Sequence, residues 1–241
     1  MTKTATKFII VSGYPKSGNT WCTRLVAEAI GCPSRGYLGR RLYRGKRDIT
    51  TEGLDRVSDF AVWKSHHEYL WIREVHPRVS VLHIVRDPRD VAVSGALFFT
   101  VDEYNQFYGT DVNCFEAMVR TVCDGGINNC KRPWAQWVRP YLEGKTLTVR
   151  YEDLLDDPLR ELQRIMLAWG ISRSETALHA AIEKQSFATT LKQAKASGKS
   201  SKIKIVRNGQ TGDFRKYLTA EQIARIEASC KAEMAALGYE A

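Results

Sequence analysis

Residues 8–21 read Phe8-Ile9-Ile10-Val11-Ser12-Gly13-Tyr14-Pro15-Lys16-Ser17-Gly18-Asn19-Thr20-Trp21, and this stretch decides the fold. Its first half is apolar and β-branched, which predicts a buried strand. Gly13 and Pro15 break that run, and a helical pattern then extends from Thr20 to Gly31. A strand, a glycine-containing turn and a helix start together form an anion site, because backbone N–H groups point outward there and the helix dipole adds positive charge.

The glycine spacing in this stretch is that of a phosphate-binding loop. Four residues separate Gly13 from Gly18, and Thr20 supplies a hydroxyl near the usual position. A nucleoside triphosphatase carries a lysine directly before that hydroxyl, where this chain has Asn19. The lysine of this chain, Lys16, lies inside the loop instead. The sequence therefore predicts a loop that holds a phosphate group with its cation placed differently.

Composition and charge narrow the class of protein. The 241 residues are 44% hydrophobic and 26% charged, which predicts a globular protein with one domain spanning residues 1–241. A net charge of +9 favours a polyanionic ligand, but the basic residues are spread out and form no nucleic-acid motif, so nucleic acid is not expected. There is no apolar run of 18 residues, and the six scattered cysteines lack metal-binding spacing. We expect a cytoplasmic protein with reduced thiols, no metal and no membrane association.

Apolar runs alternate with helical patterns along the rest of the chain. Further strands are predicted at 60–64, 79–85 and 146–151. Helices are predicted at 21–30, from residue 91 onward, and at 115–122, 134–141, 158–169, 175–184 and 219–237. This alternation predicts an α/β fold with three layers, in which helices flank a central, mostly parallel sheet of the P-loop-containing nucleotide-binding type.

Charged residues follow two of the predicted strands. Ligands of parallel α/β sheets bind beyond the carboxyl ends of the strands, so Lys64, at the end of one strand, and His66, just after it, are candidates for the catalytic site. His67 is a close rival of His66, because strand alternation sends their side chains to different sides.

Arg86 follows the next predicted strand, where a nucleoside triphosphatase typically has an acidic magnesium ligand. The planar fork of an arginine predicts a second fixed anion there. Pro88 and Asp90 suit the start of the helix that follows, and Ser94 lies within reach on its first turns.

Three segments have no predicted helix or strand, apart from a short helix that is possible after Thr51. Residues 34–58 form an Arg- and Gly-rich loop that is either solvated or faces a ligand. Residues 98–113 are aromatic and irregular, and either simply pack or line a pocket for an apolar acceptor. Residues 192–204 are predicted to be a mobile basic segment, which leads into an Arg/Gly loop suited to a phosphate.

Taken in chain order, these segments resemble the PAPS-dependent sulfotransferase family of the cytosolic type, whose donor PAPS is 3′-phosphoadenylyl sulfate. Residues 14–21, YPKSGNTW, are similar to the family's phosphosulfate loop YPKSGTTW, with Asn19 as the departure. Four further segments resemble, in turn, the catalytic K-T-H segment, the 3′-phosphate segment, the YED segment near the adenine and the RKGxxGDWK loop: residues 64–66, 86–94, 151–154 and 207–216.

The resemblance implies transfer of a sulfuryl group from PAPS to a hydroxyl or amine of a small-molecule acceptor, with PAP as product and no metal. It implies that His66 is the general base. It implies that the 5′-phosphosulfate is held by Lys16, Ser17, Gly18, Asn19 and Thr20. It implies that the 3′-phosphate is held by Arg86, Ser94, Arg207, Asn208 and Gly209, and that the adenine is flanked by Trp21, Tyr151 and Phe187. The family's dimer motif KxxxTVxxxE is poorly kept at 215–224, so monomer and homodimer both stay open.

Two other functions fit part of the pattern. A P-loop kinase of a small metabolite needs a lysine at the position of Asn19 and an acidic magnesium ligand after a strand, and the sequence has neither in the expected place. A non-catalytic nucleotide-binding module would keep the phosphate loops and have no use for a base at His66.

Overall fold

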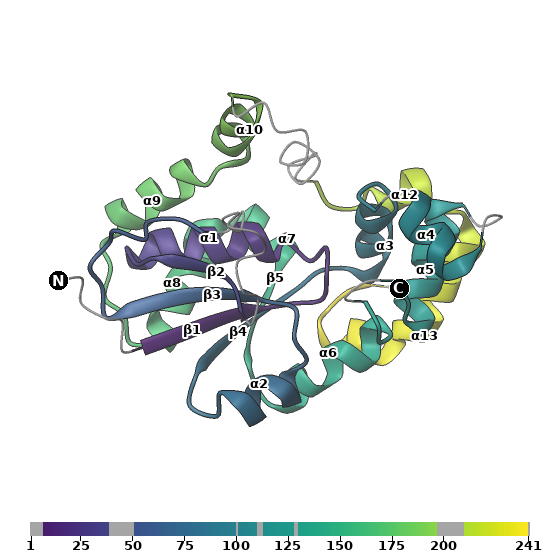
Figure 1. Cartoon of the computed structure of the whole chain (residues 1–241), viewed down its shortest axis with the longest axis horizontal. Helices are drawn as coiled ribbons and strands as arrows, with labels where there is room; N and C mark the ends of the chain where they lie inside the picture. The colour runs from purple at the N-terminus through teal and green to yellow at the C-terminus, as the bar shows by residue number, and fades with distance from the viewer. Residues whose placement is uncertain are drawn as a thin grey trace.

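A parallel sheet forms the centre of the protein (Figure 1). The computed structural model describes residues 7–38, 51–99, 101–109, 113–127, 130–196 and 210–240, with the backbone alone for 193–196. Within these residues the strands lie in the order β2-β3-β1-β4-β5, and every neighbouring pair is parallel. The strands are β1 (Lys7–Ser12), β2 (Ser34–Tyr37), β3 (Phe60–Ser65), β4 (Ser80–Val85) and β5 (Leu147–Arg150).

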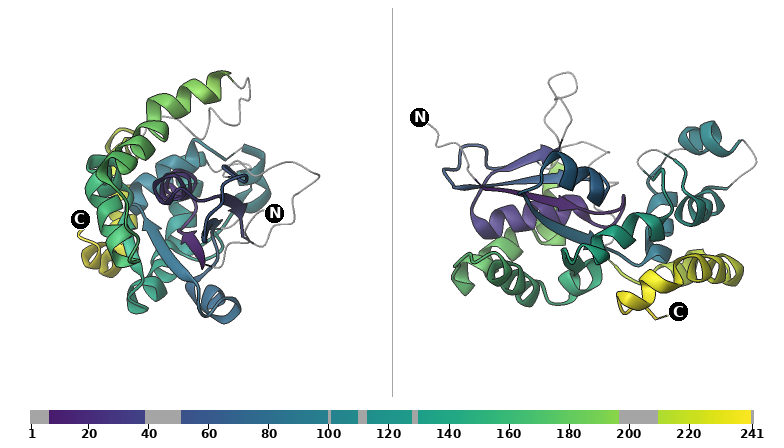
Figure 2. Two further views of the ribbon diagram at one scale, coloured as in Figure 1. Left: turned by 90° about the vertical axis from the view of Figure 1, so that its left-hand side faces the viewer. Right: turned by 90° about the horizontal axis from the view of Figure 1, so that it is seen from below.

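Helices connect and cover these strands. The longer ones are α1 (Asn19–Ile30), α3 (Pro88–Ala96), α5 (Cys114–Asp124), α6 (Trp134–Glu143), α8 (Pro158–Ala168), α9 (Glu175–Lys184), α10 (Phe187–Ala196) and α13 (Ala220–Ala236). The shorter ones are α2 (Tyr69–Val75), α4 (Val101–Tyr108), α7 (Tyr151–Asp156) and α12 (Phe214–Tyr217). Helices α9 and α13 lie at opposite ends of the molecule (Figure 1; Figure 2, right).

Strand alternation sends apolar side chains to both faces of the sheet. Ile9 and Val11 of β1 pack into a cluster with residues of α1, α8 and α9. Ile10, between them, belongs to a second cluster with residues of α3, α5, α6 and α13. A strand buried on both faces is mostly apolar, which is why β1 and β4 were visible in the sequence as apolar runs, interrupted in β4 by His83. The predicted three-layer α/β fold is confirmed.

Two segments predicted to be irregular contain regular structure. Residues 34–37, placed in a loop, form the edge strand β2, whose polar residues and glycine give no apolar pattern and which forms by pairing with β3. Helix α4 occupies 101–108 of the segment predicted as irregular, with Asp102 and Glu103 in its first turn and Tyr104 buried. Residues 39–50, 100 and 110–112 of these segments lie outside the described part of the chain.

Other predicted element boundaries differ from those in the structure. Tyr151, predicted as the last residue of a strand, begins α7, and α2 was not predicted. The segment 192–204 begins inside α10, and residues 197–204 lie outside the described residues. All six cysteines are unpaired thiols, five of them buried. Among the helices that the structure describes, none combines the length and apolarity needed to cross a membrane.

A buried histidine in β4 makes stability depend on pH. His83 is fully buried against the ring of Tyr141, with ring centroids 4.4 Å apart, and its Nδ1 lies 3.2 Å from the Thr148 hydroxyl. The hydroxyl of Thr148 donates to the Thr146 carbonyl, so Nδ1–H donates to Thr148. Within the described residues Nε2 has no hydrogen-bond partner. Burial lowers the pKa of His83 from 6.5 to about 3.

We expect the free energy of unfolding to fall as the pH drops below 6.5 toward 3, because only the unfolded chain then takes up a proton at His83. His83→Phe keeps the ring stacking and removes this proton linkage. Urea unfolding at about pH 7.5 and about pH 5.5 should show that the variant loses about 1 kcal/mol less than the natural protein. His179→Phe, at an exposed site of α9, is the control. An equal pH dependence in the natural and His83→Phe proteins would contradict the assignment.

Candidate active site

Four strand ends meet at one edge of the sheet. The residues that follow them are Gly13 after β1, His66 after β3, Arg86 after β4 and Tyr151 after β5. The chain runs from β1 to one side of the sheet for β2 and β3, and then to the other side for β4 and β5. Such a reversal of strand order opens a crevice at the carboxyl ends of the strands, which is where α/β proteins bind ligands.

The loop between β1 and α1 is shaped to hold an anion. Gly18 precedes α1 with φ of 89°, and Lys16, although not a glycine, also adopts a left-handed φ of 75°. A non-glycine residue held in this region costs about 1–3 kcal/mol, so the loop stores strain at the helix start. The Ser17 hydroxyl is buried and has no hydrogen-bond partner among the described residues. An anion accepting from this hydroxyl and from N–H groups at the start of α1 would fit here.

The side chain of Asn19 joins two strand ends. Its Nδ2 donates to the Gly13 carbonyl and to the Ser65 carbonyl, at 3.0 Å each. Asn19 was expected to bind the phosphosulfate, and its side-chain donors are instead used within the protein. The difference arises because the ladder between β1 and β3 ends at the pair Ser12 and Ser65, and two carbonyls beyond it need donors.

The two histidines after β3 have different surroundings. His66 Nδ1 lies 2.8 Å from the Gly13 carbonyl, and the ring lies 5.7 Å from that of Tyr37. Because a carbonyl only accepts, Nδ1 carries a proton, and in the neutral form of the ring Nε2 would hold the lone pair. His67 stacks on Trp71 at 3.8 Å, and burial lowers its pKa. His66 is thus the histidine bonded to the phosphate loop.

Two lysines lie near aromatic rings at this edge. The Lys16 ammonium lies 3.3 Å from the centroid of the Phe98 ring, and the Lys64 ammonium 5.8 Å from that of Tyr37. A ring face attracts a cation, so the Phe98 ring helps to hold the Lys16 ammonium beside the loop. Phe98 belongs to the aromatic segment 98–113 that was expected either to pack or to line an acceptor pocket, whereas Tyr37 lies in the segment predicted as a loop and was not singled out.

Arg86 is held mainly by neutral groups. Its guanidinium donates to the carbonyls of Gln210, at 3.0 Å, and Lys16, at 3.5 Å, and lies 4.6 Å from the Tyr151 ring centroid. The nearest carboxylate oxygen with a measured contact, on Asp90, is 3.9 Å away. Its Nε is buried without a partner among the described residues. This environment suits an arginine that receives an anion.

Asp90 anchors the C-terminal segment beside Arg86. Its carboxylate accepts from the backbone N–H of Gly212 at 2.7 Å and of Phe214 at 3.1 Å. Burial outweighs the nearby Arg86 and raises the pKa of Asp90. The sequence indicated Asp90 only as a helix-start residue, since its distant partners leave no local signal. Arg207, Asn208 and Gly209 lie outside the described residues.

Two of the three predicted adenine-flanking rings meet. Trp21 and Tyr151 make an edge contact with centroids 5.7 Å apart, and the Trp21 indole donates to the Gln185 carbonyl at 2.9 Å. Phe187 lies two residues further on, at the start of α10, and within the described residues its ring contacts neither of the other two. Thr20 lies in the first turn of α1 and Ser94 in the second half of α3, both half-buried.

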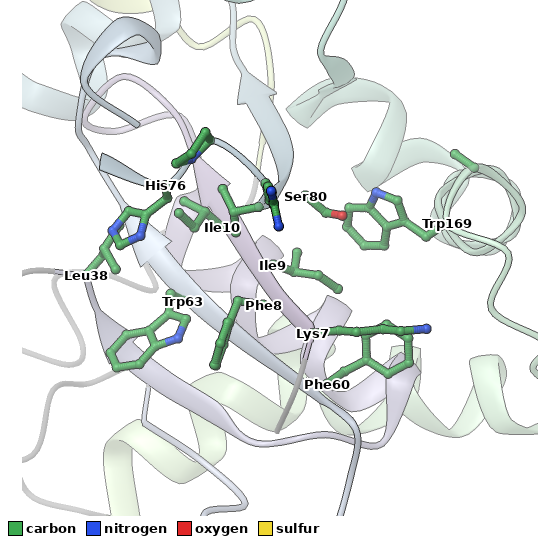
Figure 3. A pocket seen from close by; sticks show the side chains of 14 residues that line it. Lys7, Phe8, Ile9, Ile10, Leu38, Phe60, Trp63, His76, Ser80 and Trp169 are labelled. Atoms are coloured by element: carbon green, nitrogen blue, oxygen red, sulfur yellow. The ribbon is translucent and has the colours of Figure 1, made fainter. Parts of the chain in front are cut away.

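A separate cavity of about 800 Å³ lies near the opposite, amino ends of β1, β3 and β4 (Figure 3). Phe8, Trp63 and Trp169 contribute much of its apolar wall, and His76 and Ser80 lie at its edge. It shares no lining residue with the phosphate loop or with the Arg86 region. The candidate active site is therefore the carboxyl edge, where the polar groups converge.

Comparison with known proteins identifies the family. The chain matches the sulfotransferase domain family over residues 6–238. It therefore belongs to this family and is a PAPS-dependent sulfotransferase. The predicted resemblance, enzyme class and PAPS/PAP cofactor pair are confirmed.

Individual relatives agree with this assignment. Sulfotransferase 1A1 of Bos taurus is 25% identical over 252 residues, which cover 94% of this chain and 83% of the relative. Carbohydrate sulfotransferase 2 of Homo sapiens is 38% identical over 104 residues, which cover 42% of this chain and 18% of the relative.

Solved structures share the fold. Mouse sulfotransferase SULT7A1 complexed with PAP has a TM-score of 0.69 and 19% identity, covering 97% of this chain and 86% of that one. Retinol dehydratase in complex with androsterone and PAP has a TM-score of 0.64 and 17% identity, covering 97% and 82%. These likenesses confirm the predicted P-loop-containing fold type.

Gly18→Ala should damage the site more than an ordinary glycine replacement. The added methyl would lie 2.5 Å from Tyr151 Cδ2, at a φ that disfavours any side chain. Gly170→Ala is the matched control, because its φ is also positive, at 62°, and no heavy atom lies within 4 Å of the methyl.

We expect Gly170→Ala to cost about 1 kcal/mol of unfolding free energy with unchanged PAP affinity. Gly18→Ala should cost more and weaken PAP binding about tenfold or more, which corresponds to about 1.4 kcal/mol. Chemical unfolding and calorimetric titration with PAP measure the two effects. Equal losses in the two variants would mean that the Tyr151 contact is unimportant.

Proposed function

We propose that this enzyme moves a sulfuryl group from PAPS to a hydroxyl or amine of a small-molecule acceptor, with His66 as the general base. One observation carries the proposal: His66 Nδ1 donates to Gly13 of the phosphate loop, so the basic Nε2 belongs to a ring fixed beside the anion site. We further propose that the enzyme is cytoplasmic and that residues 1–241 form a single catalytic domain.

Two polar atoms without a hydrogen-bond partner among the described residues support PAPS as the sulfuryl donor. The Ser17 hydroxyl and the Arg86 Nε are both buried without a partner among the described residues, and each can donate to an anion. In this proposal the loop from Lys16 to Thr20 holds the 5′-phosphosulfate, although the Asn19 side chain takes no part. Arg86 and Ser94, together with residues 207–209, hold the 3′-phosphate, and Trp21 and Tyr151 flank the adenine. Phe187 is proposed as a third adenine contact.

The chemistry needs a base on one side and cations on the other. His66 Nε2 takes the proton from the acceptor while the acceptor atom forms its bond to sulfur, and the bond from sulfur to the bridging phosphate oxygen breaks. Negative charge develops on that oxygen, which stays with PAP. Lys16 and the loop N–H groups stabilise it in the manner of an oxyanion hole, and Lys64 adds positive charge at the same edge.

The acceptor side is aromatic. Tyr37 lies beside His66, and Phe98 lies against Lys16, so both rings border the proposed point of transfer. Apolar and aromatic walls with few polar groups are typical of small-molecule sites. Retinol dehydratase, a structural neighbour, has been solved with androsterone and with retinol. We infer a small organic acceptor for this enzyme also.

Nucleotide preference tests the proposal against a kinase and a binding module. PAPS or PAP should raise the melting temperature without magnesium, because they bind the folded state alone, whereas ATP with magnesium should not. Turnover of PAPS with a library of phenols, alcohols and amines then separates an enzyme from a module. Stabilisation by magnesium-ATP alone would favour the kinase, and tight PAPS binding without turnover of any acceptor would favour the module.

His66→Ala should lower kcat by about 10²–10⁴-fold, the usual contribution of a general base, and leave PAP affinity nearly unchanged. His67→Ala is the matched control, since it removes the neighbouring imidazole that stacks on Trp71. Single-turnover kinetics and PAP titration separate chemistry from binding. An active His66→Ala protein together with an inactive His67→Ala protein would transfer the role to His67.

A further inference from the structure

The Asn19 carboxamide occupies the point where the sheet ends between β1 and β3. The backbone ladder stops at the pair Ser12 and Ser65. One residue beyond β1, the Gly13 carbonyl comes near the Ser65 carbonyl, and the two N–H bonds of Asn19 Nδ2 satisfy both, at 3.0 Å each. Buried carbonyls without donors are costly, so this amide completes the hydrogen bonding of the strand ends.

The two carbonyls match a side chain with two donors. A carboxamide nitrogen has two hydrogens, whereas a threonine hydroxyl has one and can satisfy one of the two carbonyls. Asn19 is 3% exposed, and a Cβ added to Gly13 would lie 2.9 Å from Asn19 Nδ2, so the amide in this position requires a glycine at residue 13.

The same Gly13 carbonyl accepts the hydrogen bond from His66 Nδ1 at 2.8 Å. The Gly13 carbonyl oxygen therefore accepts two hydrogen bonds, one from Asn19 at the start of α1 and one from His66 just after β3. Its position decides the orientation of the imidazole and favours the tautomer with hydrogen on Nδ1.

We propose that Asn19 is a positioning residue for His66, which fixes the ring and its tautomer through the shared Gly13 carbonyl and does not bind the cofactor through its side chain. The inference rests on the proposed role of His66 as base. The side-chain oxygen of Asn19 supports the same conclusion. Asn19 Oδ1 is buried and without a partner among the described residues, and an acceptor oxygen gives no attraction to phosphosulfate oxygens.

Asn19→Leu removes both donors and keeps the branched outline of the side chain, although it is bulkier, and Asn19→Thr keeps one donor. Nitrogen-15 NMR of the imidazoles, with His66→Ala to assign the signal, reports the tautomer without any need for turnover. We expect Nδ1–H for His66 in the natural protein, a mixture of tautomers in Asn19→Leu, and an intermediate mixture in Asn19→Thr. If Asn19→Leu fails to fold, which circular dichroism will show, the Asn19→Thr protein carries the test.

Kinetics and binding complete the experiment. Asn19→Leu should lower kcat about tenfold or more and shift its pH profile, with the Kd of PAP within about twofold of the natural value. Ser17→Ala is the contrast, because loss of a cofactor contact should weaken PAP binding and leave the His66 tautomer unchanged. An unchanged tautomer in both Asn19 variants, or a loss of PAP affinity with the tautomer intact, overturns the proposal. A shifted tautomer alongside a fully active His66→Ala protein would instead overturn the base role of His66 and leave the Asn19 contact standing.

Discussion

The close approach of the chain at Gly13 is the constraint on which the rest of the site depends. A Cβ at this position would lie 2.3 Å from the Ile84 carbonyl oxygen of the neighbouring strand, so only a glycine fits between β1 and β4. That fit lets the loop turn directly over the sheet edge and start α1 with its N–H groups toward the crevice. It also leaves the Gly13 carbonyl facing β3, where Asn19 and His66 reach it. Sheet packing, the anion loop and the histidine are thus joined at one peptide group.

Two arginines of one short segment have different surroundings. Arg89 is pinned between the carboxylates of Asp87, at 2.7 Å, and Glu227, at 2.5 Å, and these partners raise its pKa despite burial. The ion pair with Glu227 connects α3 to α13. Arg86 has carbonyl oxygens and an aromatic face as its closest partners, which orient the guanidinium without cancelling its charge. A sequence pattern with both arginines cannot distinguish them, because their partners lie more than a hundred residues away in some cases.

Much of the fold and part of the site followed from the sequence for physical reasons. Strands β1 and β4 are buried on both faces, so their apolar runs predict them, and the glycines of the loop have geometric roles that only glycine fills. Strand β2 could not be predicted, since a short edge strand takes its structure from its neighbour. The side-chain hydrogen bonds of Asn19 could not be predicted, because a motif shows which residue occupies a position and not which way its side chain turns. The different contacts of His66 and His67 likewise appear only in three dimensions.

The hydrogen bonds between Asp90 and the C-terminal segment have a consequence for biosynthesis. The bond from Gly212 to Asp90 joins residues 122 positions apart in the chain. Domains fold as their residues emerge during translation, and parallel sheets with distant contacts form slowly. In a nascent chain this bond can therefore form only after residue 212 has been made, when α12 and α13 alone among the described helices remain to be synthesised.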